Sequence, residues 1–333
     1  MNKLQKLISK LGTEHVFIQT HNFPDPDAIS SAFGLQYLLQ LYGISSTICY
    51  KGKIDRCNTR KMMEMFGISA TNVDKLGDSI KGSKIILIDA QKNNGNTYDL
   101  ECEEVISIDH HPIFENVAYI HSDIRSEVGA CASIIASYFV ENEIDIPENV
   151  ASALLYGIKV DTAKMTRGVS KLDMDMFYTL FFKANNKQIT YLEQNSIQLE
   201  DLKAYGSAID SIHVVDGVSF ANTGADCPEA LIAEIADFTA ELQNVYFSVV
   251  YSIKKEGIKL SVRSLRHSGC NAGEIIIEAL EGIGTGGGHV TMAAGYVSFR
   301  DKTETAEQLI ERIIENFKRI VSKRVCEYTP LAM

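Results

Sequence analysis

Short apolar runs alternate with longer segments of helical periodicity through the first half of the chain. Residues 84–88 (KIILI) form an almost continuous apolar run, which is typical of a strand buried on both faces. Apolar residues between about 27 and 41 instead recur at the spacing of one helix face. This alternation predicts βαβ units and an N-terminal, doubly wound, mostly parallel α/β sheet. Further strands are predicted at 15–20, 46–50 and 104–108, with helices at about 128–140 and 148–160.

The pattern changes after the first domain, which we place at residues 1–185. Residues 186–208 are polar and hold no convincing strand, so we interpret them as a helical connector. Strand and helix patterns then mix, which predicts a smaller α+β domain over residues 209–333. The elements predicted there are a hairpin at about 209–222 that turns at Asp216-Gly217, a helix at 227–241, strands at about 245–253 and 258–264, a helix at 272–281, a glycine-rich loop, a strand near 293–299 and a helix at 303–323.

Composition and charge narrow the class of protein. The 333 residues are 45% apolar and carry a formal charge of −11, which disfavours the coating of long nucleic acids but admits small anions held through metal ions. Seven cysteines without a CxxC pair argue against a disulfide framework or a zinc knuckle and indicate a reducing compartment. No apolar stretch has membrane-spanning length, and the N-terminus is typical of an amphipathic helix, not of a signal peptide. We therefore expect a cytoplasmic protein without membrane contact.

The first candidate motif is HNFPDPDA at residues 21–28, directly after the first predicted strand. Ligands of open α/β sheets bind at the carboxyl ends of strands, and this loop places one imidazole and two carboxylates there. The mixed nitrogen and oxygen donors of His21, Asp25 and Asp27 suit a divalent ion such as Mn²⁺ better than zinc held by thiolates. Taken alone, a turn in which Asp27 caps the next helix is an equally good interpretation.

Three further clusters follow apolar segments. Asp89 ends the run KIILID, where an ordinary turn is the alternative, and DHHP at residues 109–112 follows another predicted strand. Adjacent histidines point in different directions, so one can bind metal while the other faces a substrate and the aspartate orients a histidine. Asp161 ends the segment GIKVD at residues 157–161, and a helix-end cap is its alternative. Together these carboxylates and histidines can hold two metal ions ~3.5–4 Å apart.

The second half contains GTGGGH at residues 284–289. Consecutive glycines let backbone N–H groups approach an anion, although a flexible turn gives the same signal. Arg263-Ser264 ends a predicted strand upstream and suits a phosphate or a nucleotide. We interpret the following Arg266 and His267 as solvated turn residues.

These residues resemble the DHH phosphoesterase superfamily. The resemblance rests on HNFPDPDA at 21–28, Asp89, DHH at 109–111 and GIKVDT at 157–162. GGGHVTMAAG at 286–295 is similar to the signature of the DHH-associated C-terminal domain of the first type. The chain is most similar to the nanoRNase and pAp-phosphatase branch. The resemblance implies two domains around an active-site cleft and two divalent ions, Mn²⁺ first, with Mg²⁺ or Co²⁺ as alternatives.

The resemblance also implies a role for each residue. One metal is expected on His21, Asp25 and Asp89, and a second on Asp27, Asp89, His110 and Asp161, with Asp89 as the bridge. His111 is expected to face the substrate phosphate and leaving group, and Asp109 to support the histidines. One departure is Pro26, where many members have glycine; it stiffens the loop without changing the ligands. The residues expected to bind substrate are Arg263, Ser264, Gly286, Gly287, Gly288 and His289.

The predicted function is manganese-dependent hydrolysis of phosphoester bonds in short oligonucleotides (nanoRNA), in 3′,5′-bisphosphonucleotides such as pAp, or in both. Alternatives are a linear or cyclic dinucleotide phosphodiesterase, an exopolyphosphatase or pyrophosphatase, and a non-catalytic nucleotide-binding protein. The last predicts losses among the ligands, whereas all of the proposed ligand positions hold suitable residues. Expected partners are short RNA or DNA oligonucleotides or mononucleotides, with no binding of long duplexes. A homodimer is expected by analogy alone.

Overall fold

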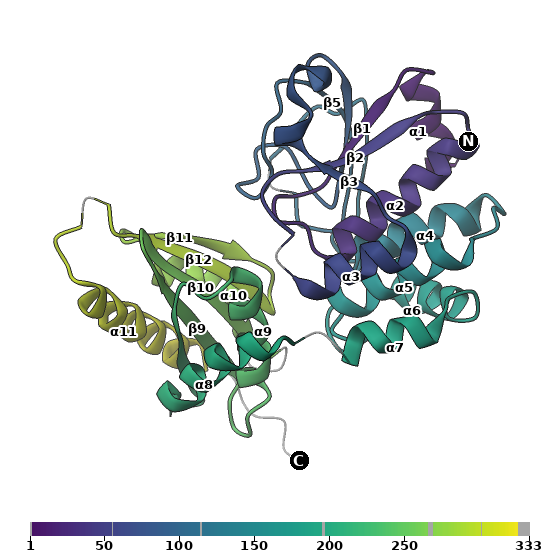
Figure 1. Cartoon of the computed structure of the whole chain (residues 1–333). Helices are drawn as coiled ribbons and strands as arrows, with labels where there is room; N and C mark the ends of the chain where they lie inside the picture. Colours follow the sequence, from purple (N-terminus) through teal and green to yellow (C-terminus); the bar gives the residue numbers. More distant parts are fainter. Residues whose placement is uncertain are drawn as a thin grey trace. The chain divides into compact units, whose positions relative to one another are not determined.

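The computed structural model describes residues 2–54, 56–113, 115–194, 197–265, 269–300 and 302–325. The chain forms two compact units, Met1–Ser196 and Ile197–Met333 (Figure 1). The division falls inside the segment interpreted from sequence as a connector. Arg266 and His267 lie outside the described residues. Among the described residues, no helix is both long and apolar enough to cross a lipid bilayer.

The strands of the first unit are β1 (Val16–Gln19), β2 (Ser46–Tyr50), β3 (Ala70–Asn72), β4 (Lys84–Ile88), β5 (Glu103–Asp109) and β6 (His121–Ile124). They form one sheet in the order β3-β2-β1-β4-β5-β6, and every neighbouring pair is parallel. The predicted parallel α/β sheet is confirmed. Because β1 pairs with both β2 and β4, the strand order reverses there, and such a switch point is where open α/β sheets bind ligands.

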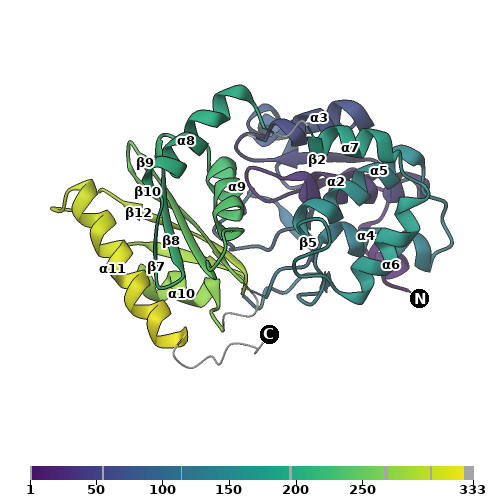
Figure 2. The ribbon, with the colours of Figure 1, turned by 90° about the horizontal axis from the view of Figure 1, so that it is seen from below.

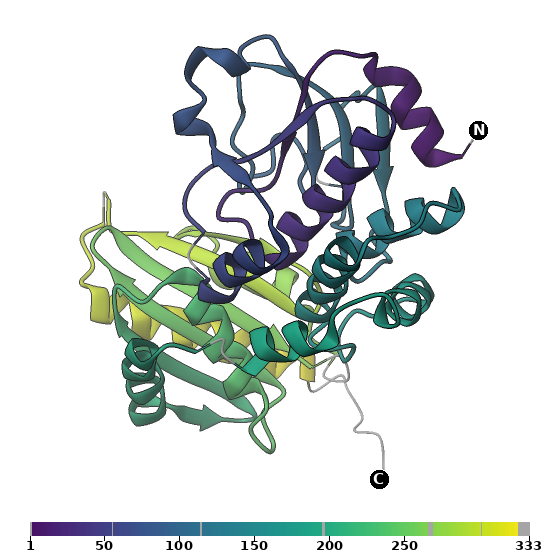
Figure 3. The same cartoon turned by 45° about the vertical axis from the view of Figure 1, so that its right-hand side comes forward.

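The helices of the first unit are α1 (Lys3–Leu11), α2 (Pro26–Leu41), α3 (Cys57–Phe66), α4 (Cys131–Glu141), α5 (Glu148–Asp161), α6 (Lys171–Phe181) and α7 (Asn186–Gln194), with 3₁₀ turns η1 (Val73–Lys75) and η2 (Gly77–Ile80). Val16 and Ile18 of β1 pack into the helical core, whereas Phe17 packs on the opposite face with residues of the 3₁₀ turns. Helix α2 packs against both α4 and α5 (Figure 3). The site-bearing ends of these helices are therefore fixed by a shared core.

Sequence patterns missed some elements of the first unit. Strand β6 has the sequence HSDI, which is mostly polar and lacks the apolar pattern that predicts a strand. The structure shows why a carboxylate is tolerated there, because Asp123 accepts hydrogen bonds from Arg125 at 2.9 and 2.7 Å and from the Tyr138 hydroxyl at 2.8 Å. A buried carboxylate is stable when it is paired and hydrogen-bonded. Helices α3 and α6 and the short strand β3 were also not predicted.

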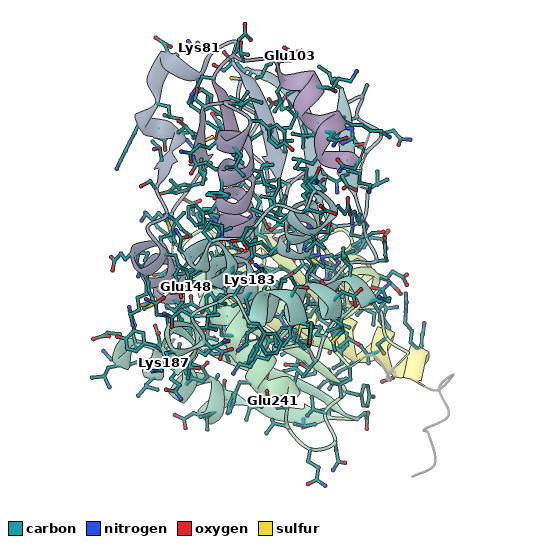
Figure 4. The ribbon with its side chains drawn as sticks, turned by 90° about the vertical axis from the view of Figure 1, so that its right-hand side faces the viewer. Lys81, Glu103, Glu148, Lys183, Lys187 and Glu241 are labelled. Carbon is teal, nitrogen blue, oxygen red and sulfur yellow. The ribbon has the colours of Figure 1, made fainter. Side chains whose placement is uncertain are left out.

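The two ends of this sheet differ in their side chains. Lys81 and Glu103 lie at the end where β4 and β5 begin (Figure 4). Asp89 and Asp109 stand at the opposite end, directly after β4 and as the last residue of β5. The parallel direction of the strands thus gathers the predicted ligands at one edge.

The second unit contains η3 (Leu199–Asp201), α8 (Leu202–Ser211), β7 (His213–Val215), β8 (Val218–Ala225), α9 (Glu229–Ala240), β9 (Phe247–Lys254), β10 (Gly257–Ser264), α10 (Ala272–Ala279), β11 (Thr285–Gly288), β12 (Met292–Ser298) and α11 (Ala306–Val325). In the described residues its sheet has the order β11-β12-β10-β9-β8-β7; β8 and β9 are parallel, and the other neighbouring pairs are antiparallel. Helices α10 and α11 cover one face and α8 and α9 the other, so the sheet lies between α9 and α11 (Figure 2). The predicted α+β class of this half is confirmed.

Two sequence predictions in this unit are wrong in detail. Residues 285–288 form strand β11, paired antiparallel with β12, where the sequence pattern predicts a glycine-rich loop. The backbone there is extended and hydrogen-bonded into the sheet, so it does not form the turn-like nest expected for an anion. The hairpin predicted at 209–222 begins later, because α8 continues to Ser211, although its turn at Asp216-Gly217 does join β7 to β8.

Candidate metal centre

The loop after β1 is organised by the start of α2. Asp25 is the N-cap residue of this helix, and its Oδ1 accepts hydrogen bonds from the backbone N–H groups of Asp27 at 3.0 Å and Ala28 at 3.1 Å. Pro26 follows as the first helical residue, a position that needs no N–H donor. Asp25 therefore caps the helix, whereas Asp27 lies inside its first turn and keeps its carboxylate for other partners.

The first group of possible ligands joins this loop to β4. Nε2 of His21 lies 3.6 Å from Oδ2 of Asp89 and 3.9 Å from Oδ1 of Asp25. His21 Nδ1 contacts the carbonyl of Asn22 at 2.8 Å, which leaves Nε2 to face the two carboxylates. Asp89, directly after β4, adopts a left-handed backbone conformation with φ of 54°, which is uncommon for a residue with a side chain.

The second group gathers around His110. Its Nε2 lies 3.3 Å from Oδ1 of Asp89, 3.3 Å from Oδ2 of Asp161 and 3.9 Å from Oδ2 of Asp27. Its Nδ1 lies 3.2 Å from the carbonyl oxygen of Val128. A proton on Nδ1 therefore satisfies that carbonyl, and the Nε2 lone pair then points at three carboxylates. A cation is the partner that such a set of donors requires.

Asp27 is fixed by the start of a second helix. Its Oδ2 accepts a hydrogen bond from the backbone N–H of Cys131 at 2.7 Å, and its Oδ1 from that of Ala132 at 2.9 Å. These groups open α4, so the helix dipole also favours a negative charge at this point. Asp27 is fully buried, which leaves its position little freedom.

Asp109 organises the two histidines that follow it. Its Oδ1 accepts hydrogen bonds from the backbone N–H groups of His110 at 2.8 Å and His111 at 3.2 Å, and contacts His111 Nδ1 at 2.8 Å. Its Oδ2 accepts a hydrogen bond from the Gln91 side-chain amide at 2.7 Å. Burial alone would raise the pKa of Asp109, but the hydrogen bond from His111 and the charges of both histidines hold it well below its usual range.

Crowding of carboxylates dominates the electrostatics. Burial, followed by the nearby charges of Asp89 and Asp161, raises the pKa of Asp27 well above its usual value. Burial lowers the pKa of His21, but its contacts with Asp25 and Asp89 outweigh this and raise the pKa to about 10. Bringing so many like charges together is unfavourable unless protons or cations neutralise them.

The residues present fit divalent metal ions. Oδ1 of Asp89 is buried and has no hydrogen-bond partner in the described part of the chain, although His110 Nε2 lies 3.3 Å away. Mixed imidazole and carboxylate donors are typical ligands of Mn²⁺ and related ions. The side chains whose donor atoms lie within 4.8 Å of one another form three overlapping groups: His21, Asp25 and Asp89; Asp27, His110 and Asp161; and Asp89, Asp109, His110 and His111.

The structure thus brings together the side chains that the sequence nominated in four separate segments of the first unit. Their assignment as metal ligands, with Asp89 as the bridge, stays a prediction. Sequence reasoning missed supporting residues, among them Gln91 and Asp173. Asp173 is buried and accepts hydrogen bonds from Gly129 N at 2.8 Å and Ser133 Oγ at 2.6 Å, next to the start of α4. The capping box that it forms with Ser170 is the sequence signal that could have drawn attention to it.

The predicted substrate residues of the second unit lie on different strands. The Arg263 guanidinium binds both oxygens of Asp237 on α9, at 2.5 and 3.1 Å, and also donates to Ser261 Oγ at 2.9 Å. Ser264 Oγ donates to the Cys270 carbonyl at 2.7 Å. Gly286, Gly287 and Gly288 lie on β11, followed by His289, and β12 runs between them and β10. The substrate-binding role of these six residues stays a prediction.

A parallel sheet that gathers overlapping groups of aspartates and histidines at its switch point defines an α/β protein with a candidate centre for two divalent ions. Two family descriptions match the chain: "DHH family, N-terminal domain" over residues 15–158 and "DHHA1 domain" over residues 214–319. The chain therefore contains a DHH-family N-terminal domain followed by a DHHA1 domain.

Individual relatives extend this comparison. The uncharacterized protein MJ1633 of Methanocaldococcus jannaschii is 32% identical over 306 residues, which are 90% of this chain and 62% of that protein. A probable manganese-dependent inorganic pyrophosphatase of Streptococcus thermophilus is 31% identical over 150 residues, 44% of this chain and 48% of the relative. The chain thus spans between about half and three fifths of the length of these relatives.

Among solved structures, an exopolyphosphatase-related protein from Bacteroides fragilis aligns with a TM-score of 0.78 at 18% sequence identity. The alignment covers 96% of this chain and 95% of that protein. At this level of identity the likeness establishes a shared fold.

Proposed function

We propose that the protein is a metal-dependent phosphoesterase that hydrolyses short oligonucleotides, 3′,5′-bisphosphonucleotides such as pAp, or both. The observation that carries the proposal is the set of overlapping His/Asp groups, in which Asp89 joins His21 and Asp25 to His110, and His110 in turn joins Asp27 and Asp161. His21, Asp25 and Asp89 would hold one ion, and Asp27, Asp89, His110 and Asp161 the other. Bound Mn²⁺, or Mg²⁺ or Co²⁺ in its place, would polarise the phosphoryl oxygens and lower the pKa of water.

His111 is the residue best placed to handle a proton. Its side chain is 28% exposed, in contrast to the buried His110. Asp109 Oδ1 lies 2.8 Å from the Nδ1 of His111 and fixes the ring. A histidine oriented by a buried carboxylate can donate a proton to a leaving group, which contributes typically about 10²–10⁴-fold to a rate. We therefore assign the general acid role to His111 and the positioning role to Asp109.

Two observations support a short nucleotide as the substrate: the match of the second domain to DHHA1 and the negative net charge of the chain. The DHHA1 match shows that the C-terminal half is a family domain in its own right, and the sequence resemblance links that pairing to nucleotide substrates. The net charge of −11 disfavours long polyanions that would have to lie along much of the surface. A short substrate needs only the metal centre and a few local contacts.

Pyrophosphate or polyphosphate hydrolysis is the second candidate. The relative named as a manganese-dependent pyrophosphatase favours it, because the DHH-type centre is the feature most easily shared. That similarity spans only 44% of this chain, too little to include both domains. We therefore rank this candidate below nucleotide hydrolysis.

A panel of substrates tests the proposal. The purified chain, freed of metal and reloaded with Mn²⁺, is assayed on pAp, a 5′-labelled dinucleotide, a longer RNA, a cyclic dinucleotide, pyrophosphate and polyphosphate. We expect pAp and the short oligonucleotide to be hydrolysed fastest. Faster turnover of pyrophosphate or polyphosphate would establish the second candidate, and no hydrolysis of any substrate by the metal-loaded protein would refute the phosphoesterase proposal.

Two variants connect the activity to the residues. Asp89→Ala should abolish turnover, because Asp89 contacts both ligand groups. Asp123→Ala removes a similarly buried aspartate in β6 and controls for lost stability. His111→Gln should keep its metal and lose about 10²-fold or more in kcat. Near-wild-type turnover of Asp89→Ala would refute the assignment of that residue.

A further inference from the structure

A pocket of about 480 Å³ lies in the first unit beside β2, β3 and α3. Its volume lies within the ~300–1,000 Å³ typical of small-ligand sites. Resting on the function proposed above, we propose that this pocket binds the sugar–phosphate backbone of a short single-stranded nucleic acid next to its scissile phosphate. The residues of the pocket that the argument uses are Tyr50, Gly52, Lys53, Arg60, Glu64 and Lys75.

Phe23 connects this pocket to the candidate metal centre. It lies two residues from both His21 and Asp25 in the loop after β1. Its backbone N–H donates to the carbonyl of Lys51 at 3.0 Å. Its ring lies against Gly52, where an added Cβ would come within 2.8 Å of the ring. Gly52 of the pocket is therefore in direct contact with Phe23 of the loop that carries His21 and Asp25, within the same unit.

The charge of the pocket suits a phosphate backbone. Among the residues that the structure describes, Lys53, Arg60 and Lys75 line the pocket together with one carboxylate, Glu64, in a chain whose net charge is −11. In the parts of the chain that the structure describes, Lys53 and Lys75 are exposed and no carboxylate lies within ion-pairing distance of either ammonium group. Local positive charge beside a metal centre attracts polyanions and positions them through their phosphates. The sequence shows the same concentration, since residues 51–61 include five basic residues and one acidic residue.

Aromatic side chains at the pocket favour a nucleic acid over a simple anion. Tyr50 lines it at the end of β2, and Phe23 next to it is 53% exposed although its backbone is fixed. Stacking of a base on an aromatic ring contributes about 1–3 kcal/mol per base and tolerates any sequence. Cations beside exposed rings are the combination that binds single strands without reading their sequence.

The first arm of the test follows hydrolysis against substrate length. The double variant Lys53→Gln/Lys75→Gln is compared with wild type on pAp, a dinucleotide, a trinucleotide and a pentanucleotide. We expect kcat/KM to fall about ten-fold for the pentanucleotide, with KM carrying the change, and the loss to shrink as the substrate shortens. The slope of log KM against log salt should decrease by roughly 1.4, which is two phosphate contacts at ~0.7 each.

A matched control removes the same charge elsewhere. Lys6 and Lys10 are exposed residues of α1, which packs against β6 at the opposite edge of the sheet. Lys6→Gln/Lys10→Gln should leave kcat/KM at every length within about two-fold of wild type, because charges beyond a Debye length of ~10 Å are largely screened. An equal loss in this control would refute a local pocket and indicate an effect of net charge.

The second arm measures binding without turnover. Anisotropy of a labelled, phosphorothioate-linked pentanucleotide is recorded with the Mn²⁺-loaded protein, and we expect the pocket variant to bind about ten-fold more weakly than wild type. Unchanged binding, or a loss of kcat/KM that is equal for pAp and the pentanucleotide, would overturn the pocket. If wild type cleaves none of the substrates, the proposed function fails, while this arm still decides whether the pocket binds the strand.

Discussion

Gly157→Ala tests how closely helix α5 packs against the candidate metal centre. The substitution should favour the helix by its intrinsic propensity, but it adds a methyl group next to the residue Asp27. Gly157 lies inside α5, and an alanine in a helix interior ordinarily stabilises it by about 0.5–1 kcal/mol relative to glycine. Here α5 packs against α2, and Gly157 lies beside Asp27 and Ser30 near the start of that helix. A Cβ at position 157 would lie 2.2 Å from Ser30 Oγ and 3.2 Å from both Cα and Oδ1 of Asp27.

The magnitude follows from these distances. Ordinary contact begins near 3.4 Å, so the hydroxyl would have to retreat by 3.4 − 2.2 = 1.2 Å, and Asp27 by about 0.2 Å. Ser30 is fully buried and donates to the Asp27 carbonyl at 3.1 Å, so rotating it away leaves a buried hydroxyl without its acceptor. Overpacking of this kind costs about 1–3 kcal/mol. A displacement of ~1 Å in a catalytic arrangement can cost about 10²-fold in rate.

A double-mutant cycle isolates the clash. Urea unfolding and Mn²⁺-dependent hydrolysis are measured for Gly157→Ala, Ser30→Ala and the double variant. We expect the first to lose about 1–3 kcal/mol and at least ten-fold in kcat/KM, and the double variant to recover part of both. Gly206→Ala in α8, where nothing lies within 4 Å of an added Cβ, is the control and should be neutral or stabilising. Wild-type stability and turnover in Gly157→Ala would refute the packing argument.

Three further predictions concern stability and metal. Asp123→Asn should destabilise the protein by about 2–3 kcal/mol at neutral pH, because the Arg125 pair and the Tyr138 hydrogen bond lose their charged acceptor. Burial raises the pKa of Asp123, but Arg125 and Lys3 outweigh this effect and lower the pKa. The ionised carboxylate therefore stabilises the fold above the unfolded-state pKa of about 3.9. In urea unfolding, the difference in stability between wild type and Asp123→Asn should become smaller as the pH falls below that value. Chelation should lower Tm, and added Mn²⁺ should restore it. At a metal concentration of about 100 Kd, binding should raise the free energy of unfolding by about 2.7 kcal/mol. A Tm that does not change with metal would contradict the ligand assignment. Asp173→Ala should cost about 2–3 kcal/mol in thermal unfolding by leaving Gly129 N–H and the Ser133 hydroxyl unsatisfied, whereas the exposed Asp175→Ala should be within about 0.5 kcal/mol of wild type.

The sequence was sufficient where chemistry follows a strong strand pattern. Asp89 and Asp109 come at the ends of apolar runs, and parallel strands necessarily bring such ends to one edge of a sheet. The motif after the first strand added its ligands to that edge for the same reason. The fold class and the gathering of the ligands that follow strands were therefore predictable from local patterns, whereas Asp161, at the end of α5, was linked to them only by the family resemblance.

Other features depend on contacts between distant segments. The carbonyl of Val128, which lies next to His110 Nδ1, has no local sequence pattern that marks it. The capping box of Ser170 and Asp173 marks a helix start, but not the contact of Asp173 with the start of α4. The sequence predicts a loop where β11 lies because glycines have no side-chain periodicity, and only the pairing with β12 defines this strand. Strand β6 was missed because its buried Asp123 is stabilised by partners elsewhere in the chain.

The spectrum and stoichiometry of bound manganese test the central claim most directly. Metal-free protein is titrated with Mn²⁺, and bound ions are counted while electron paramagnetic resonance reports whether they are magnetically coupled. The account predicts two ions per chain with a coupled spectrum, and loss of the coupling in Asp89→Ala. A single ion, or two ions without coupling in the wild type, would contradict a shared centre at Asp89.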